Sequence, residues 1–102
     1  MGIFSKNTLK PGGSKKVKYK FKEDEILKRV QIYIDRTYDQ HYSTDKIQAT
    51  EFIMDSGHGE GFCMGNIIKY AKRYGKKAGK NELDLFKIIH YAIILLGDDE
   101  TN

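Results

Sequence analysis

The sequence contains little that could cross-link the chain, break a helix or anchor it in a membrane. It has one cysteine, one proline and no tryptophan in 102 residues. A single cysteine excludes an intramolecular disulfide, which is typical of reducing compartments, so we expect a cytoplasmic protein. The one proline is Pro11, and none interrupts a helix after it. No apolar run approaches the roughly 20 residues that span a bilayer, so we predict no membrane partner.

Acidic residues are absent from residues 1–22, where seven lysines give a net charge of +7. Residues 23–102 carry 11 basic and 14 acidic side chains, a net charge of −3, although the whole chain is +4. A nucleic-acid-binding domain usually has an excess of positive charge over its folded surface. We therefore predict a flexible, largely disordered basic leader over residues 1–22, for which a solvated tail is the first interpretation and weak nucleic-acid contact the alternative. Apolar residues and lysines alternate from Val17 to Phe21, so a short extended segment docked on the core is also possible.

Apolar residues recur at intervals of three and four between residues 23 and 97, which predicts an all-α fold. The predicted helices cover about residues 23–38, 44–55, 60–74 and 82–97. Asn81 should cap the last of them and Gly97 should end it, leaving residues 98–102 as an acidic tail. We expect a small four-helix bundle-like domain over residues 23–97. The last helix is apolar almost all round, which indicates a central position or a shared interface, so we expect a homo-oligomer.

The third predicted helix carries a stripe of basic and amide residues. Asn66, Lys69 and Arg73 recur at i, i+3 and i+7, so an amide, an ammonium and a guanidinium share one face. No acid occurs between Glu60 and Glu82. A solvated helix face normally mixes charges, so this stripe indicates an anionic partner.

The fourth predicted helix carries a second polar row at the same spacing, Asp84, Lys87 and Tyr91. Asp84 and Lys87 could form a surface ion pair worth under ~1 kcal/mol. The alternative is that this row faces the basic stripe across a helical hairpin and forms a ligand pocket with it. The spacing leaves both interpretations open.

Other chemistries fit the sequence poorly. Residues 75–81 are not a phosphate-binding P-loop, because three residues rather than four separate the glycines, Asn81 replaces Ser or Thr, and a helix precedes the segment. We predict no metal site, because the cysteine and histidines lack ligand spacing; they are Cys63, His41, His58 and His90. A MazG-like nucleotide pyrophosphohydrolase, which uses acidic pairs to bind magnesium, is an alternative whose acidic pattern is incomplete here.

The segment from His41 to Leu96 resembles the small phage-encoded domain family called SaV-like, which includes a podophage nucleotide kinase. The resemblance covers a little more than half of the chain. Its most specific part is the run Gly65-Asn66-x-x-Lys69-Tyr70-x-x-Arg73-x-Gly75-x-Lys77, preceded by His41-Tyr42 and followed by Asp84, Lys87 and Tyr91.

The resemblance implies a phage protein of nucleotide metabolism that acts as a (deoxy)nucleoside monophosphate kinase without a Walker A loop. A non-catalytic protein that binds or sequesters a nucleotide, including a host signalling nucleotide, is the alternative. A nucleoside triphosphate would be the donor, and magnesium is permitted but not demanded by the sequence. The expected catalytic residues are Lys69, Arg73 and Asp84, and the expected substrate-binding residues are His41, Tyr42, Asn66, Tyr70, Lys77, Lys87 and Tyr91.

Overall fold

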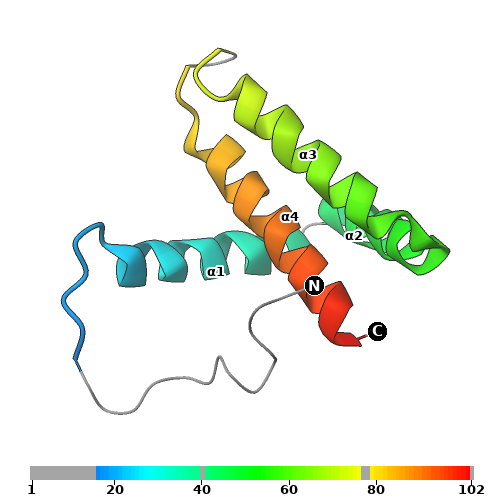
Figure 1. The fold of residues 1–102 in the computed structure, drawn as a ribbon, viewed down its shortest axis with the longest axis horizontal. Coiled ribbons are helices and arrows are strands. Elements are labelled where there is room, and N and C mark those ends of the chain that lie inside the picture. The colour runs from blue at the N-terminus through cyan, green and yellow to red at the C-terminus, as the bar shows by residue number, and fades with distance from the viewer. Residues whose placement is uncertain (1–15, 40, 77–78, 102) are drawn as a thin grey trace.

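A computed structural model of the chain describes residues 16–39, 41–76 and 79–101, with the backbone alone for residues 41–44, 100 and 101. It contains four α-helices, and none of the described residues forms a strand, so the all-α prediction is confirmed. The helices are α1 (Glu23–Asp39), α2 (His41–Ile53), α3 (Gly59–Arg73) and α4 (Glu82–Thr101) (Figure 1). None of them is long and apolar enough to cross a membrane.

The helix α1 begins at the three acids Glu23, Asp24 and Glu25, which suit the positive end of the helix dipole. The side chain of Glu23 also accepts a hydrogen bond from the backbone N–H of Phe21 at 2.9 Å. Residues 16–22 before the helix form no regular structure and are exposed, including Val17 and Phe21. Among residues 16–22, the structure therefore does not show the alternative of an extended segment docked on the core.

The junction of α2 and α3 is a π-type turn, Met54–His58, in which Gly57 has φ +90°. A side chain would be strained at this φ, so glycine permits the change of direction. Gly59 follows as a buried residue, and a Cβ atom there would lie 2.6 Å from the sulfur of Met54. Glycine at these two positions therefore lets the start of α3 pack closely on the end of α2.

The α3–α4 connection turns at Gly75, whose φ is +83° and whose N–H donates to the carbonyl of Gly79 at 3.0 Å. Asn81 caps α4, because its side-chain oxygen accepts the N–H of Leu83 at 3.0 Å, as predicted. The predicted stop at Gly97 is wrong, since α4 continues to Thr101. A helical glycine costs only about 1 kcal/mol relative to alanine, so the residues around Gly97 can carry the helix through it.

The helices form two layers. The helices α3 and α4 run antiparallel and side by side, while α1 and α2 lie behind them and α1 crosses behind α4 at a steep angle (Figure 1). Arg29 of α1 pairs with Glu82 at the start of α4 and lies 5.4 Å from the ring centre of Phe86. These contacts fix the N-terminal half of α1 against α4.

The buried hydrophobic residues among those described are few, namely Val30, Cys63, Tyr70 and Phe86. Several residues whose spacing predicts a core position are exposed instead, namely Leu27, Tyr38, Phe52, Ile93 and Leu96. The spacing of the apolar residues predicted the helices correctly, but four helices are too few to cover every apolar helix face.

Candidate functional site

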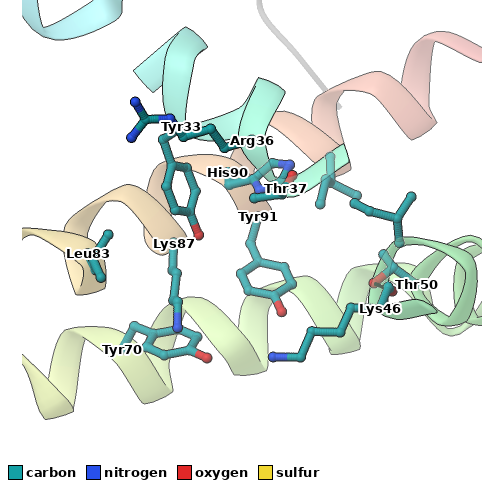
Figure 2. A pocket seen from close by; sticks show the side chains of 12 residues that line it. Tyr33, Arg36, Thr37, Lys46, Thr50, Tyr70, Leu83, Lys87, His90 and Tyr91 are labelled. Atoms are coloured by element: carbon teal, nitrogen blue, oxygen red, sulfur yellow. Dashed lines mark hydrogen bonds between the residues drawn. The ribbon is translucent and has the colours of Figure 1, made fainter. Parts of the chain in front are cut away.

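A pocket of about 450 Å³ lies between the two layers, and all four helices contribute to its wall (Figure 2). This volume falls within the ~300–1,000 Å³ of small-molecule sites. The described lining residues are Tyr33, Arg36 and Thr37 of α1, Lys46, Ile47 and Thr50 of α2, Tyr70 of α3, and Leu83, Lys87, His90, Tyr91 and Ile94 of α4.

Aromatic rings form the centre of the wall. The rings of Tyr70 and Tyr91 stack with centres 6.3 Å apart, and Phe62 meets Tyr91 edge-on at 5.7 Å. On the opposite side, Tyr33 contacts the ring of His90 edge-on at 6.0 Å. Burial raises the pKa of both Tyr33 and Tyr91, so these phenols stay protonated and can donate hydrogen bonds at neutral pH.

Three cationic side chains surround the rings, one each from α1, α2 and α4. The ammonium of Lys87 lies 5.0 Å from the ring centre of Tyr70. Lys46 extends from α2 beneath Tyr91, and Arg36 lies on the Tyr33 side (Figure 2). The lining that the structure describes contains these three cations and no carboxylate, which favours an anionic ligand.

His90 is the remaining ionisable group in the wall. Burial lowers its pKa below the usual value, because a charged imidazole is poorly solvated there. The ring is therefore neutral at pH 7 and can both donate and accept a hydrogen bond. The hydroxyls of Thr37 and Thr50 already donate to carbonyls within their own helices, those of Ile34 at 2.7 Å and Lys46 at 2.9 Å.

Two further cations lie close to Tyr70 at the edge of the pocket, although neither of them lines it. The ammonium of Lys69 is 4.6 Å and the guanidinium of Arg73 is 5.8 Å from the Tyr70 ring centre. Together with Lys87, these residues place three cations around one buried tyrosine, an arrangement in which each is attracted to the ring face.

Asp84 holds Arg73 in this position. Its side chain is buried, and one carboxylate oxygen lies 3.6 Å from the Nε of Arg73. The Nε of Arg73 and the other oxygen of Asp84 have no hydrogen-bond partner within the described residues. The pair therefore links α3 to α4, but Asp84 does not line the pocket itself.

The predicted site residues fall into four groups. Tyr70, Lys87 and Tyr91 line the pocket, and Lys69, Arg73 and Asp84 lie at its edge, so the two polar rows do meet across the α3–α4 hairpin. Asn66 does not line the pocket, and its amide donates to the carbonyl of Phe62 in its own helix at 2.9 Å. The side chains of His41 and Tyr42, and Lys77 as a whole, lie outside the described residues.

The lining residues of α1 and α2 were not predicted from the sequence. A signal existed on α1, where Arg29, Tyr33 and Arg36 recur at i, i+4 and i+7 and therefore share one face. Nothing in the spacing of Lys46 and Thr50 on α2 distinguishes them from an ordinary solvated face. His90 lies one residue from Tyr91 and was missed because it is outside the i, i+3, i+7 row.

Comparison with protein families matches residues 36–93 to DUF3310, which is described as a protein family of unknown function. The matched range includes α2, α3 and all the pocket residues of α4 except Ile94. No curated protein and no solved structure matches the chain. Because the match covers more than half of the 102 residues, the chain belongs to the DUF3310 family.

Proposed function

We propose that the pocket binds a nucleotide and that the protein is a phage-encoded (deoxy)nucleoside monophosphate kinase without a Walker A loop. One observation carries the proposal: the described lining combines three cations, three tyrosines and a neutral histidine with no carboxylate. Such a lining suits a ligand that is both anionic and aromatic. The resemblance of the Gly65–Lys77 run to nucleotide kinases of the SaV-like family supports the choice of a nucleotide.

The pocket residues would have two tasks, binding the phosphates and binding the base. The cationic groups of Lys87, Lys46 and Arg36 would neutralise the phosphates. Hydrogen bonds from cationic donors to phosphate oxygens are stronger than those between neutral groups. The base would lie against Tyr33 or Tyr91, since aromatic stacking contributes about 1–3 kcal/mol per base. His90, neutral at pH 7, would offer a hydrogen bond to the base edge or to the acceptor.

Transfer of a phosphoryl group depends mainly on positioning and on stabilising charge in the transition state. Lys69 and Arg73 lie next to Tyr70 at the pocket edge, where they could contact the phosphates of a triphosphate donor. Asp84 would act through Arg73 by holding its guanidinium in place. Magnesium would arrive mainly with the donor's phosphates, because no three described His, Cys, Asp or Glu side chains are grouped as metal ligands.

The binding step is tested with Lys87→Ala against the matched control Lys72→Ala, an exposed lysine of α3 outside the pocket. Losing a hydrogen bond to a charged group costs about 1.5–3 kcal/mol, so the Kd of Lys87→Ala for deoxynucleoside monophosphates should rise about 10- to 100-fold. Lys72→Ala should change it less than about threefold, since exposed charges act weakly through solvent. Calorimetric titration that detects no nucleotide binding to the wild type would overturn the proposal.

The catalytic step is tested separately by product analysis with a triphosphate donor and each monophosphate acceptor. Kinase activity should form the corresponding diphosphate, and the double substitution Lys69→Ala/Arg73→Ala should abolish turnover while monophosphate binding persists. Binding without any product would instead select the non-catalytic nucleotide-binding protein, which the same pocket lining also fits.

A further inference from the structure

The side of the α3–α4 hairpin that faces away from the pocket is apolar and uncovered. We call it the outer face and define it by six residues: Met64, Ile68, Leu85, Ile89, Ile93 and Leu96. All are exposed except Ile89, which is half-buried. Figure 1 shows why, because α1 and α2 both lie on one side of the α3–α4 layer and no described element covers the other side.

The residues of α4 divide between two opposite faces. Since a helix turns about 100° per residue, the positions of Leu85, Ile89 and Leu96 point roughly opposite to those of Lys87, His90 and Ile94. The latter three line the pocket. Ile93, three residues after His90, lies at the border between the two faces. The outer face is thus a separate surface, and a partner could cover it without entering the pocket.

The apolar residues that α4 contributes to the outer face are spaced so that another helix can pack against them. Leu85, Ile89, Ala92 and Leu96 follow one another at intervals of four, three and four. This is the repeat that lets helices interlock with a partner helix in knobs-into-holes packing. None of the six defining residues is charged, so the face offers nothing to a nucleic acid or to a charged peptide.

The uncovered side of the hairpin approaches the size of a small protein interface. With a rise of 1.5 Å per residue, the 20 residues of α4 extend about 30 Å and the 15 residues of α3 about 22 Å. At about 10 Å of width for each helix, this side measures roughly 500 Å², and the outer face occupies its centre. A stable protein–protein interface covers about 800 Å² on each partner, and the low end of that class is about 600 Å², so a polar rim around the outer face would complete the contact.

We propose that the outer face is covered by the outer face of a second copy of this chain. The two α3–α4 hairpins would then form a four-helix bundle, with α1, α2 and the two pockets on its outside. A 4-3-4 row pairs with its own copy about a two-fold axis, and burying the outer face would enlarge a core that contains only four buried hydrophobic residues among those described.

The test is light scattering coupled to gel filtration, on the full chain, over a range of protein concentrations. The wild type should have twice the chain mass of 11.8 kDa, and Leu96→Glu should have the mass of one chain. Leu27→Glu is the matched control, because Leu27 of α1 is 64% exposed and Leu96 is 63% exposed, so it should remain dimeric. A wild type of 11.8 kDa at every concentration, or a Leu27→Glu variant that dissociates equally, would overturn the proposal.

A second measurement does not depend on a disruptive charge. Ala92 lies near the middle of the 4-3-4 row, so Ala92→Cys should form an intermolecular disulfide on mild oxidation, whereas Ala49→Cys of α2 should not. The native Cys63 is buried and should not compete. A cross-linking yield equal for the two variants would contradict the interface. Leu96→Glu should retain its helical circular dichroism and its nucleotide Kd within about threefold, so loss of the dimer and failure of the proposed function give different results.

Discussion

The two faces of α4 differ in what they offer to a partner. The face toward α1, α2 and α3 carries Lys87, His90 and Tyr91, which are polar groups held between aromatic rings. The outer face carries only aliphatic side chains, with Leu96 the most exposed of those on α4. One face can therefore recognise a small anionic molecule, and the other can only bury itself against another apolar surface. A helix that is apolar almost all round need not be central in its own domain.

The largest effect should come from truncating Tyr91 on the pocket face, and its counterpart on the outer face is Ile93. Tyr91→Ala removes a ring that stacks on Tyr70 and contacts Phe62, and it should lower the free energy of unfolding by about 2–4 kcal/mol at any protein concentration. Ile93→Ala on the outer face should cost about 1 kcal/mol in dilute solution and more as concentration rises, because dimerisation stabilises the folded state by mass action. Urea denaturation at two concentrations 100-fold apart measures both. If the loss of unfolding free energy depended on protein concentration equally in the two variants, the outer face would not be the one that dimerises.

An intermediate effect should come from the ion pair that joins α3 to the pocket side of α4. Arg73→Ala leaves the buried carboxylate of Asp84 without its cation and should cost about 2 kcal/mol, less than a fully buried pair because the guanidinium is partly exposed. Asp84→Ala leaves a guanidinium that is 37% exposed and can be hydrated, so it should cost about 1 kcal/mol. The double variant Arg73→Met/Asp84→Leu should approach the wild type in stability. If Asp84→Ala proved the more damaging single substitution, the burial argument would fail.

The smallest effect should come from the titration of His90. Its pKa is lowered by burial in the folded state, so the unfolded chain binds the proton more readily. The contribution to stability is complete above the unfolded pKa of about 6.5 and is lost as the pH falls through the lower folded pKa. The wild type should therefore lose more stability between pH 7.5 and pH 5 than His90→Gln does. A His90→Gln variant with the same pH dependence as the wild type would show that the pocket does not perturb this histidine.

The helices were largely predictable because their signals are local. The acids Glu23–Glu25 and the cap Asn81 predict the starts of α1 and α4 correctly, since they act on backbone groups within one turn. The end of α4 was predicted wrongly at Gly97, because a local breaker worth about 1 kcal/mol is a weak signal inside an otherwise helical segment.

The site was predictable only in part. The rows on α3 and α4 share a hairpin, so helical spacing is enough to bring Arg73 and Asp84, or Tyr70 and Tyr91, together. Arg36 and Lys46 reach the same pocket from α1 and α2. Arg36 shares a helix face with Tyr33, but nothing in the spacing of Lys46 distinguishes it from a solvated charge. Their role depends on how the two layers are placed.

The sequence by itself determined the all-α fold, the starts of α1 and α4 and the two polar rows, because periodicity and capping depend on neighbours along the chain. The predicted start of α2 near residue 44 is wrong, since α2 begins at His41. Only the tertiary structure decided which face of α4 meets the pocket and which is left uncovered. The helix α4 has an aliphatic stripe and a stripe that mixes aromatic and polar residues, and either could be buried. Because α1 crosses behind α4, the stripe that carries Phe86 and His90 is the one that packs against α1. Exposure of Leu85, Ile93 and Leu96 follows from that selection, since four helices in two layers leave one face of the α3–α4 layer open.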